Sequence, residues 1–575
     1  VDETTNYKVE FSNWFKHSYQ IISYPFDQDV DYGSNTVFDY FYDDATNDIV
    51  RWETKINQYE PPLTANADSI LLLSNIMVET SETVRLLHYV NQLQQHGNPA
   101  LFVGTSGTGK TAVIKSFLKG LDPADYATAT INLNSYTDAT TLRDIMQQYV
   151  DKRSGRNFGP PGGKKLVYFI DDLNMPYVDT YGTQSPIALI RQHMDYTLWY
   201  DTNESDPNRK KKIIHDCQYL AAMNSKAGSF TVNQRLMAHF ATFSCSTPTR
   251  DQLVTIYRSI LDGHLSNFSD DKIIKQSANI TNATIDLLET MSKSAKFKPS
   301  STKFHYSFTM RDVSNVFQGL VTSRPDTLTH IEFIRLWFHE CTRVFSDRLI
   351  DQNDVDAFSD VIKEISKKNF ADMDQAKLTE EPLLFGSFIH AEKAYTPVTN
   401  YEELNKSLEA FLADYNENNA HLPLVLFEMA MNHVVRIARI ISNPKGNAFL
   451  IGVGGSGKQS LTRLASWICG YDVFQIQVTR LYSSADLLED IKQLYMKCGV
   501  KSQGVTFMLT DSQIVDEKWL VYINDLLSSG DIPSLFGEDE KDSIYSSLRT
   551  ELKQNGIDDS NRAAMHEYFI NKVAK

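Results

Sequence analysis

The feature that most restricts the fold of this chain is a phosphate-binding loop. Residues 104–111 read GTSGTGKT, which is the complete G-x4-GK-[ST] pattern. An apolar run, ALFV, precedes the loop, and a run with helical periodicity, AVIKSFLKGL, follows it. Glycines let the backbone N–H groups of such a loop turn toward phosphates, and the loop needs a strand before it and a helix after it. The sequence therefore predicts an α/β fold.

A second loop occurs later in the chain. Residues 452–458 read GVGGSGK, between NAFLI and SLTRLASWI. The residue after the lysine is Gln459, where the full pattern has Ser or Thr, and Ser460 follows one position late. Two loops predict two P-loop NTPase modules. We expect each core to be a mostly parallel sheet between helices, with nucleotide at the carboxyl ends of its strands.

The loop residues supply the predicted nucleotide contacts, for ATP or ADP with Mg²⁺. Lys110 should reach the β- and γ-phosphates, and the Thr111 hydroxyl should ligate Mg²⁺. We expect the adenine to lie near Val78 and Thr80. The predicted nucleotide-binding residues of the first site are Val78, Thr80, Gly104, Gly107, Thr108, Gly109, Lys110 and Thr111. Those of the second site are Gly452, Gly454, Gly455, Ser456, Gly457, Lys458, Gln459 and Ser460.

Each loop is followed by an apolar strand that ends in aspartate. LVYFIDDLN ends in Asp171 and Asp172, and VTFMLTDSQ places Asp511 in the matching position. Asp171 and Asp511 are the predicted Mg²⁺ partners, acting through water. The next residue is glutamate in many such ATPases, where it activates the attacking water. Asp172 draws that carboxylate back by roughly 1 Å, which slows chemistry by about 10²-fold, and Ser512 is no base near neutral pH.

The second site therefore lacks the hydroxyl directly after Lys458 and the acidic base after Asp511. We expect it to bind nucleotide without efficient hydrolysis. In the first copy, Asn224 ends the strand-like run YLAAMN and would position the lytic water, with a structural cap as the alternative. Arg311 begins a helical run and would point at the γ-phosphate, with a solvated arginine as the alternative. Asp172, Asn224 and Arg311 are the predicted catalytic residues.

Composition and net charge limit the classes of partner that we expect for this chain. Apolar residues make up 42 % of the 575, enough for large cores, and the formal net charge of −16 argues against a general nucleic-acid binder. The most apolar run, at 422–431, is too short to span a bilayer. The five cysteines form no CxxC pair, which is typical of buried thiols in a reducing compartment. The acidic N-terminus is no signal peptide and has no initiator Met, so we expect a fragment of a longer chain.

Long motifs resemble those of axonemal dynein heavy chains, most closely the outer-arm beta type. GTSGTGKT, FIDDLNMP, AAMNSKAGSF and KFHYSFTMRDVSNVFQG are similar to the third AAA+ module of that family. LVLFEMAMNHVVRIARI, GVGGSGKQSLTRLASWI and TDSQIVDEKWLVYINDLLSSGDIPSLF are similar to the fourth. The resemblance implies a lead-in from the preceding module at 1–60, an αβα core of the third module at 61–250, its helical lid at 251–395, and an incomplete fourth core at 396–575.

The resemblance also implies a function. It is that of a regulatory nucleotide-binding portion of a microtubule motor ATPase that drives ciliary or flagellar beating, in the axoneme of the cytoskeleton. Its implied partners are the other AAA+ modules of the same chain and, through the full-length protein, intermediate and light chains and microtubules; nucleic acid and membrane are not expected.

One position departs from the pattern of the dynein family. The family's third module reads RL-x-RH, its second Arg acting as a finger toward the preceding site, whereas residues 235–240 read RLMAHF. Ala238 stands at the finger position, which argues against that trans-activation unless Arg235 substitutes for the finger.

Two alternative functions remain open. A self-contained AAA+ remodelling ATPase is one alternative reading of the chain. A structural module in which both sites are dead is the other.

Overall fold

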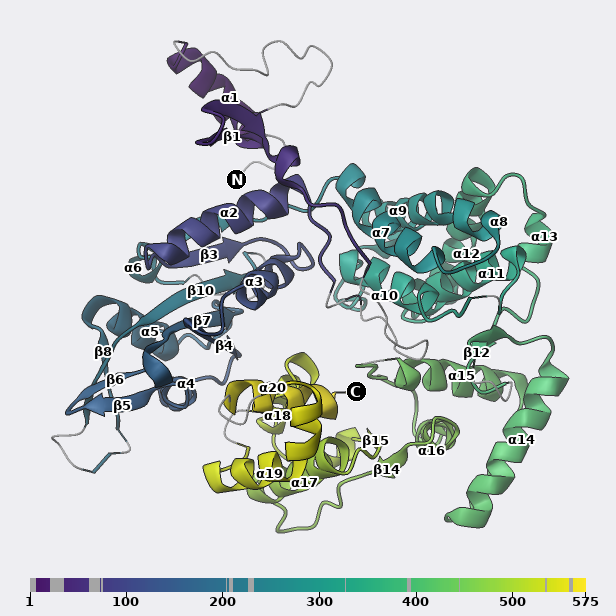
Figure 1. The fold of residues 1–575 in the computed structure, drawn as a ribbon. Helices are drawn as coiled ribbons and strands as arrows, with labels where there is room; N and C mark the ends of the chain where they lie inside the picture. The colour runs from purple at the N-terminus through teal and green to yellow at the C-terminus, as the bar shows by residue number, and fades with distance from the viewer. Residues whose placement is uncertain are drawn as a thin grey trace.

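The computed structural model describes residues 7–20, 36–61, 73, 76–202, 204–205, 210–225, 232–325, 327–389, 394–443, 445–532, 535–557 and 562–574. A first α/β core is followed by a bundle of helices, which we call the lid, and then by a second unit (Figure 1). The C-terminal helices of the second unit return toward the first core (Figure 1). None of the helices in these ranges is long and apolar enough to cross a membrane.

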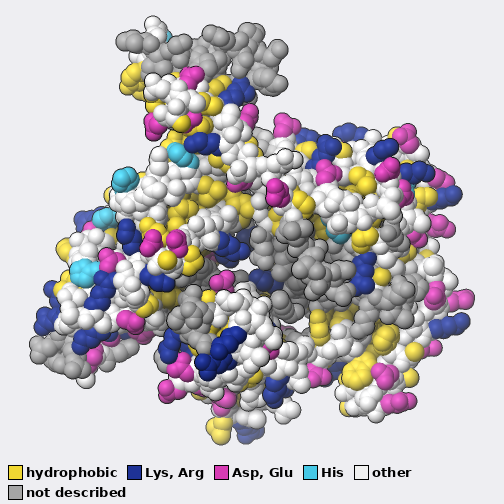
Figure 2. Space-filling view, in the orientation of Figure 1, with side chains coloured by type: hydrophobic (Ala, Val, Ile, Leu, Met, Phe, Trp, Pro, Cys, Tyr) yellow, Lys and Arg dark blue, Asp and Glu magenta, His cyan; other side chains and the backbone are white. Residues whose placement is uncertain are grey.

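A small N-terminal segment projects from the first core (Figure 1). Its buried Trp52 stacks on Phe41, with ring centroids 4.5 Å apart, and also contacts His88 and Tyr89 of the first core. Hydrophobic side chains gather on the outside of this segment (Figure 2). Its elements are α1 (Tyr7–Ser18), η2 (Val37–Asp39), β1 (Tyr40–Asp43), β2 (Asp48–Arg51) and η3 (Trp52–Lys55).

The first core is built on a five-stranded parallel sheet with the order β11-β3-β10-β7-β4. Its strands are β3 (Ala100–Val103), β4 (Tyr126–Asn132), β7 (Lys165–Asp171), β10 (Cys217–Met223) and β11 (Ala241–Ser244). Its helices are α2 (Ser81–Gln95), α3 (Lys110–Lys119), α4 (Ala139–Gln147), α5 (Ser185–Tyr196) and α6 (Gln234–Met237). The predicted α/β class with a parallel sheet is confirmed.

Strand β7 explains why this sheet is covered on both faces. Residues 166–170 are apolar without interruption and fully buried. Successive side chains of a strand point to opposite faces. Val167 and Phe169 accordingly join one hydrophobic cluster, and Leu166, Tyr168 and Ile170 join the other. A continuous apolar run of this kind is typical of a central strand in a parallel sheet.

A second small sheet, which the sequence analysis missed, lies beside α4 and α5. Its order is β5-β6-β9-β8, with β5 (Asp151–Ser154), β6 (Asn157–Gly159), β8 (Leu198–Tyr200) and β9 (Lys211–Ile214). Trp199 and Ile214 are buried and attach this sheet to the core. Each strand is only three or four residues long, so the hydrophobic pattern is weak.

The lid is helical, as predicted. Its main helices are α7 (Arg250–Leu265), α9 (Ser277–Lys293), α10 (Met310–Leu320), α11 (His330–Cys341) and α12 (Gln352–Asn369), with shorter turns α8 (Asp271–Lys275), η6 (Ala295–Phe297), η7 (Thr342–Ser346) and α13 (Gln375–Leu378). These helices enclose one large hydrophobic cluster. A two-stranded ribbon, β12 (Phe385–Gly386) and β13 (Thr396–Pro397), follows the lid.

The second unit is mostly helical in its described part. It comprises α14 (Tyr401–Asn418), α15 (Glu428–Ser442), α16 (Lys458–Ile468), β14 (Asp472–Phe474), α17 (Ser484–Tyr495), η8 (Met496–Val500), β15 (Val505–Phe507), η9 (Asp511–Gln513), α18 (Trp519–Ser528), α19 (Glu538–Gln554) and α20 (Arg562–Val573). Strands β14 and β15 pair in parallel.

The strand expected at NAFLI, before the second loop, is wrong for this structure, because residues 447–451 form no strand. In the first core the matching strand, β3, is held between β10 and β11, which both follow β7 in the chain. The described residues after β15 form only helices and turns. The segment before the second loop therefore has no strand on either side. Phe449 and Ile451 remain 88 % and 82 % exposed.

We predict that the buried strand β7 controls the stability of the first core. Phe169→Ala should lower the free energy of unfolding by about 3–5 kcal/mol, because it leaves a cavity in a close-packed cluster. Tyr181→Ala should change it by less than about 0.5 kcal/mol, since Tyr181 is 91 % exposed. Guanidinium denaturation followed by circular dichroism measures both, and equal effects would contradict this description of the core.

Candidate functional site

The first phosphate loop has the backbone that its glycines were expected to provide. Gly107 and Gly109 have φ angles of 81° and 82°, in the left-handed region that favours glycine. Helix α3 begins directly after Gly109. A Cβ atom on Gly104 would lie 2.3 Å from the carbonyl oxygen of Cys245, so no larger residue fits there. The loop is thereby fixed between β3 and the N-terminus of α3, which favours anions.

Lys110 lies over this loop. Its Nζ atom donates to the carbonyl oxygens of Gly104, at 2.9 Å, and Thr105, at 2.7 Å. Burial lowers the pKa of Lys110, although Asp171 and Asp172 oppose this effect. Thr108, another predicted contact, donates its hydroxyl to the carbonyl of Thr105 at 3.0 Å and belongs to the same turn.

The two predicted metal-binding residues of the first site are brought together. The Thr111 hydroxyl donates a 3.0 Å hydrogen bond to Oδ2 of Asp171, which joins the start of α3 to the end of β7. Mg²⁺ in phosphate sites keeps several waters and uses one or two carboxylates together with phosphate oxygens. A hydroxyl and a carboxylate at the mouth of a phosphate loop therefore fit this ion.

Asp172 and Arg311 face the same region. Asp172 has a φ angle of 54°, so the chain turns sharply as β7 ends. Partial burial raises the pKa of the Asp172 carboxyl, the neighbouring Asp171 raises it further, and Arg311 and Lys110 lower it. The charge of Arg311 also acts on Lys110. The structure thus places the lid arginine within electrostatic reach of the predicted base and the phosphate-binding lysine.

The lid comes close to the loop at Gly107. A Cβ atom on Gly107 would lie 3.3 Å from Cβ of Thr309, the N-cap residue of α10. The Thr309 hydroxyl accepts from the backbone N–H of Arg311, at 3.3 Å, and fixes the first turn of that helix. Sequence reasoning identified Arg311 but missed the Thr309 contact, although the capping box from Thr309 to Asp312 marks a helix start.

Three predicted residues of the first site, Asn224, Val78 and Thr80, make their recorded contacts with residues outside the phosphate loop. Asn224 follows β10, and its carbonyl oxygen accepts from the side chain of Asn174 at 3.0 Å, which ties the ends of two adjacent strands. Val78 is buried in the hydrophobic cluster of the lid, at its junction with the core. Thr80 caps α2, accepting from the backbone N–H of Thr83 at 3.3 Å. The adenine position near Val78 and Thr80 stays a prediction.

The second loop keeps the lysine geometry but not the metal pair. Lys458 donates to the carbonyl oxygens of Gly452 and Val453, the latter at 2.9 Å, as Lys110 does in the first loop. Gly457, with a φ angle of 76°, precedes α16 as Gly109 precedes α3. Asp511 lies exposed in η9. In the described part of the chain, no hydrogen bond joins it to residues 458–460.

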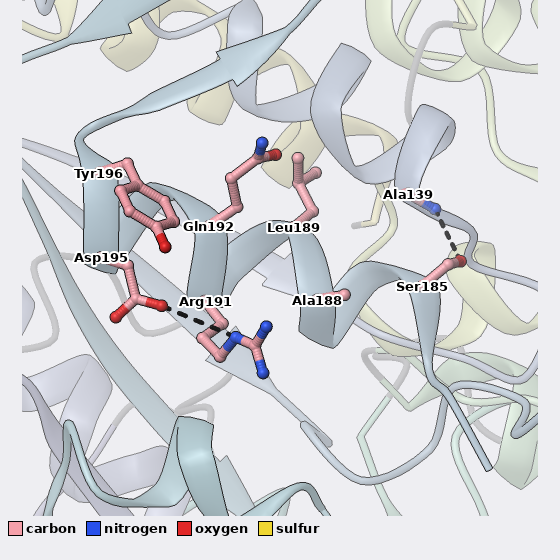
Figure 3. A pocket seen from close by; sticks show the side chains of 8 residues that line it. All are labelled: Ala139, Ser185, Ala188, Leu189, Arg191, Gln192, Asp195 and Tyr196. Atoms are coloured by element: carbon pink, nitrogen blue, oxygen red, sulfur yellow. Dashed lines mark hydrogen bonds and ion pairs between the residues drawn. The ribbon is translucent and has the colours of Figure 1, made fainter.

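Two surface hollows lie away from both loops. A cavity of about 420 Å³ lies on α5 beside the start of α4, where Arg191 pairs with Asp195 at 3.7 Å and the Ser185 hydroxyl accepts from the Ala139 N–H (Figure 3). Another, of about 550 Å³, lies between α2 and the edge strand β11. Neither is lined by a phosphate-loop residue.

The comparisons with known proteins agree with this geometry. The family model described as the P-loop containing dynein motor region matches residues 66–248, and the one for dynein motor region D4 matches residues 422–575. An AAA+ lid domain model matches residues 282–379, within the helical lid.

The whole of this chain is similar to part of several named proteins. The chain is 44 % identical over 578 residues to the ciliary dynein beta chain of Tripneustes gratilla, and 41 % identical over 587 residues to the flagellar outer-arm dynein beta chain of Chlamydomonas reinhardtii. Dynein axonemal heavy chain 17 of Homo sapiens is 42 % identical over 578 residues. All of this chain is covered in each case, but it spans only 12 % of the length of each relative. The chain belongs to the dynein heavy-chain family and carries part of its AAA+ motor region.

Proposed function

We propose that this chain is a regulatory nucleotide-binding portion of a microtubule motor ATPase, in which the first site handles ATP or ADP with Mg²⁺ and the second holds nucleotide without efficient hydrolysis. The observation that carries the proposal is the hydrogen bond between Thr111 and Asp171. Among the described residues it has no counterpart at the second loop, where Asp511 lies in the exposed turn η9.

At the first site, backbone N–H groups of the loop and the Lys110 ammonium bind the β- and γ-phosphates. Thr111 and Asp171 hold Mg²⁺, which neutralises charge on the phosphate oxygens when it is bound. Asp172 orients the attacking water from the carboxyl end of β7, and Arg311 supplies positive charge from the lid. Asn224, at the end of the neighbouring strand, positions the same water.

This first site should turn over slowly. The shorter side chain of Asp172 places its carboxylate about 1 Å farther from a water than a glutamate would, and such misplacement costs about 10²-fold in rate. Among the described residues, Arg311 is the arginine whose charge acts on both Lys110 and Asp172, and it belongs to the lid of the same module. An arginine supplied by the next module would add about 10³–10⁵ in rate in related NTPases.

Location and partners follow from the relatives, whose names are ciliary, flagellar and axonemal. The whole protein is proposed to act in the cytoskeleton of the axoneme of cilia or flagella and to drive their beating. Its partners would be the other AAA+ modules of the same heavy chain, the dynein intermediate and light chains, and microtubules.

Lys110→Ala should weaken ATP binding at the first site by about 10- to 100-fold, the loss expected for a charge-assisted hydrogen-bonding group. Titration with a fluorescent ATP analogue, in a Lys458→Ala background, measures this site alone. Lys119→Ala is the matched control, because it removes an exposed lysine from the other end of α3. If ATP affinity is unchanged by Lys110→Ala, the first site is assigned wrongly.

Mg²⁺ should matter at the first site through Asp171. In the Lys458→Ala background, removing Mg²⁺ with EDTA should weaken ATP binding, and Asp171→Asn should abolish this difference. Asp511→Asn in the same background should leave it intact, because Asp511 belongs to the other unit. A dependence on Mg²⁺ that survives Asp171→Asn would contradict the proposed metal site.

The second site should bind ATP and retain it. In the Lys110→Ala protein, we expect turnover far below about one per second, because loss of the general base alone costs about 10²–10⁴-fold. Phosphate release under saturating ATP measures the rate, and equilibrium binding confirms that the second loop is occupied. Turnover near one per second in this variant would refute the assignment, and stimulation by an unfolded protein substrate would favour a self-contained remodelling ATPase.

A further inference from the structure

A chain of neighbouring side chains and helices runs from the first phosphate loop to the second. It begins where Thr309, the N-cap of α10, lies so close to Gly107 that a Cβ atom added to that glycine would meet the Thr309 side chain at 3.3 Å. A nucleotide held by the first loop therefore lies against the end of a lid helix. Because α10 continues without interruption to Leu320, a shift of its first turn moves its far end as well.

The far end of α10 meets a buried carboxylate. A Cβ atom on Gly319 would lie 1.9 Å from Oε2 of Glu340, so glycine is needed there for the side chain of Glu340 to pack on the helix backbone. Glu340 belongs to α11 and is fully buried. A charged group in this environment must be paired.

The partner of this carboxylate comes from the second unit. Arg439 of α15 donates to Glu340 through Nε, at 3.0 Å, and through Nη2, and the Tyr395 hydroxyl donates to the same carboxylate at 2.8 Å. A two-point arginine–carboxylate contact fixes orientation as well as distance. A second pair, Arg436 with Asp347 at 3.6 Å, lies on the next turn of α15 and binds the same two units.

Helix α15 then packs on α16, which begins at Lys458 of the second loop. Their shared hydrophobic cluster includes Met431, Val434, Val435, Ala438, Leu461, Leu464 and Ala465. Close-packed interiors transmit displacements instead of absorbing them. A continuous path of packed elements therefore connects the two loops. It passes from the first loop through α10, Glu340, Arg439, α15 and α16 to the second loop.

We propose that the Glu340–Arg439 pair couples the two nucleotide sites, so that nucleotide at the first loop changes the affinity of the second, and the reverse. This inference rests on the proposed function, because it requires both loops to bind nucleotide. Coupling between binding sites is reciprocal, and it typically amounts to about 5- to 150-fold in affinity. Glu340 and Arg439 are positioning residues here, since neither touches a phosphate loop.

Calorimetric titration with the slowly hydrolysed analogue ATPγS measures the coupling. The Lys458→Ala protein gives the affinity of the first site alone, and the Lys110→Ala protein gives that of the second. In the unmodified protein, the titration gives the overall association constant for filling both sites. Without coupling, this constant would equal the product of the two single-site association constants. The coupling factor is the overall constant divided by that product. We expect it to differ from one by at least about fivefold.

Replacing both partners, Glu340→Met with Arg439→Met, should bring the factor close to one and leave each single-site affinity unchanged. Removing both charges avoids the orphaned buried charge that a single substitution leaves. Arg439→Lys is the milder variant if the double one fails to fold, and it should reduce the factor because lysine cannot make the two-point contact. Arg258→Lys is the matched control, since it alters an exposed lid pair with Asp262 and should keep the full factor.

The outcomes separate the two proposals. A factor of one in the unmodified protein, with both single-site affinities measurable, overturns the coupling alone. A factor that persists in the Glu340→Met/Arg439→Met or Arg439→Lys protein overturns the role of this pair. Absence of ATPγS binding in both single-lysine variants overturns the proposed function instead.

Discussion

Strand β7 is buried on both faces, so the backbone that carries Asp171 and Asp172 is fixed by two hydrophobic clusters at once. The hydrogen bond from Thr111 to Asp171 then ties this strand to the helix that begins at the phosphate loop. The site owes its geometry to these two constraints. Neither depends on the lid, which adds Arg311 and Thr309 from outside the sheet.

The second unit carries a similar loop pattern without a strand at residues 447–451. Its loop keeps the left-handed glycine and the lysine contacts, because these depend on residues within the loop. The strand expected before the loop is not formed by the described residues 447–451. Phosphate binding is therefore a local property of the loop, whereas the metal site requires a sheet that places an aspartate beside the loop.

Much of the first site was predictable from sequence, because a phosphate loop and an apolar strand ending in aspartate are local patterns. The lid contact with Gly107 and the burial of Glu340 were not predictable, since both depend on residues far apart in the chain. The small sheet at 151–214 was missed because each of its strands is only three or four residues long. The expected strand at NAFLI failed for the opposite reason, since its pattern was clear but its partners were absent from the described residues.

The most direct test of this account is a crystal structure of the protein with Mn²⁺ and ADP, with the metal located by its anomalous scattering. We expect nucleotide density at both loops and a metal peak beside Thr111 and Asp171. Nucleotide at the first loop without a metal peak at these two residues would contradict the proposed metal site. Empty density at the first loop would contradict the account as a whole.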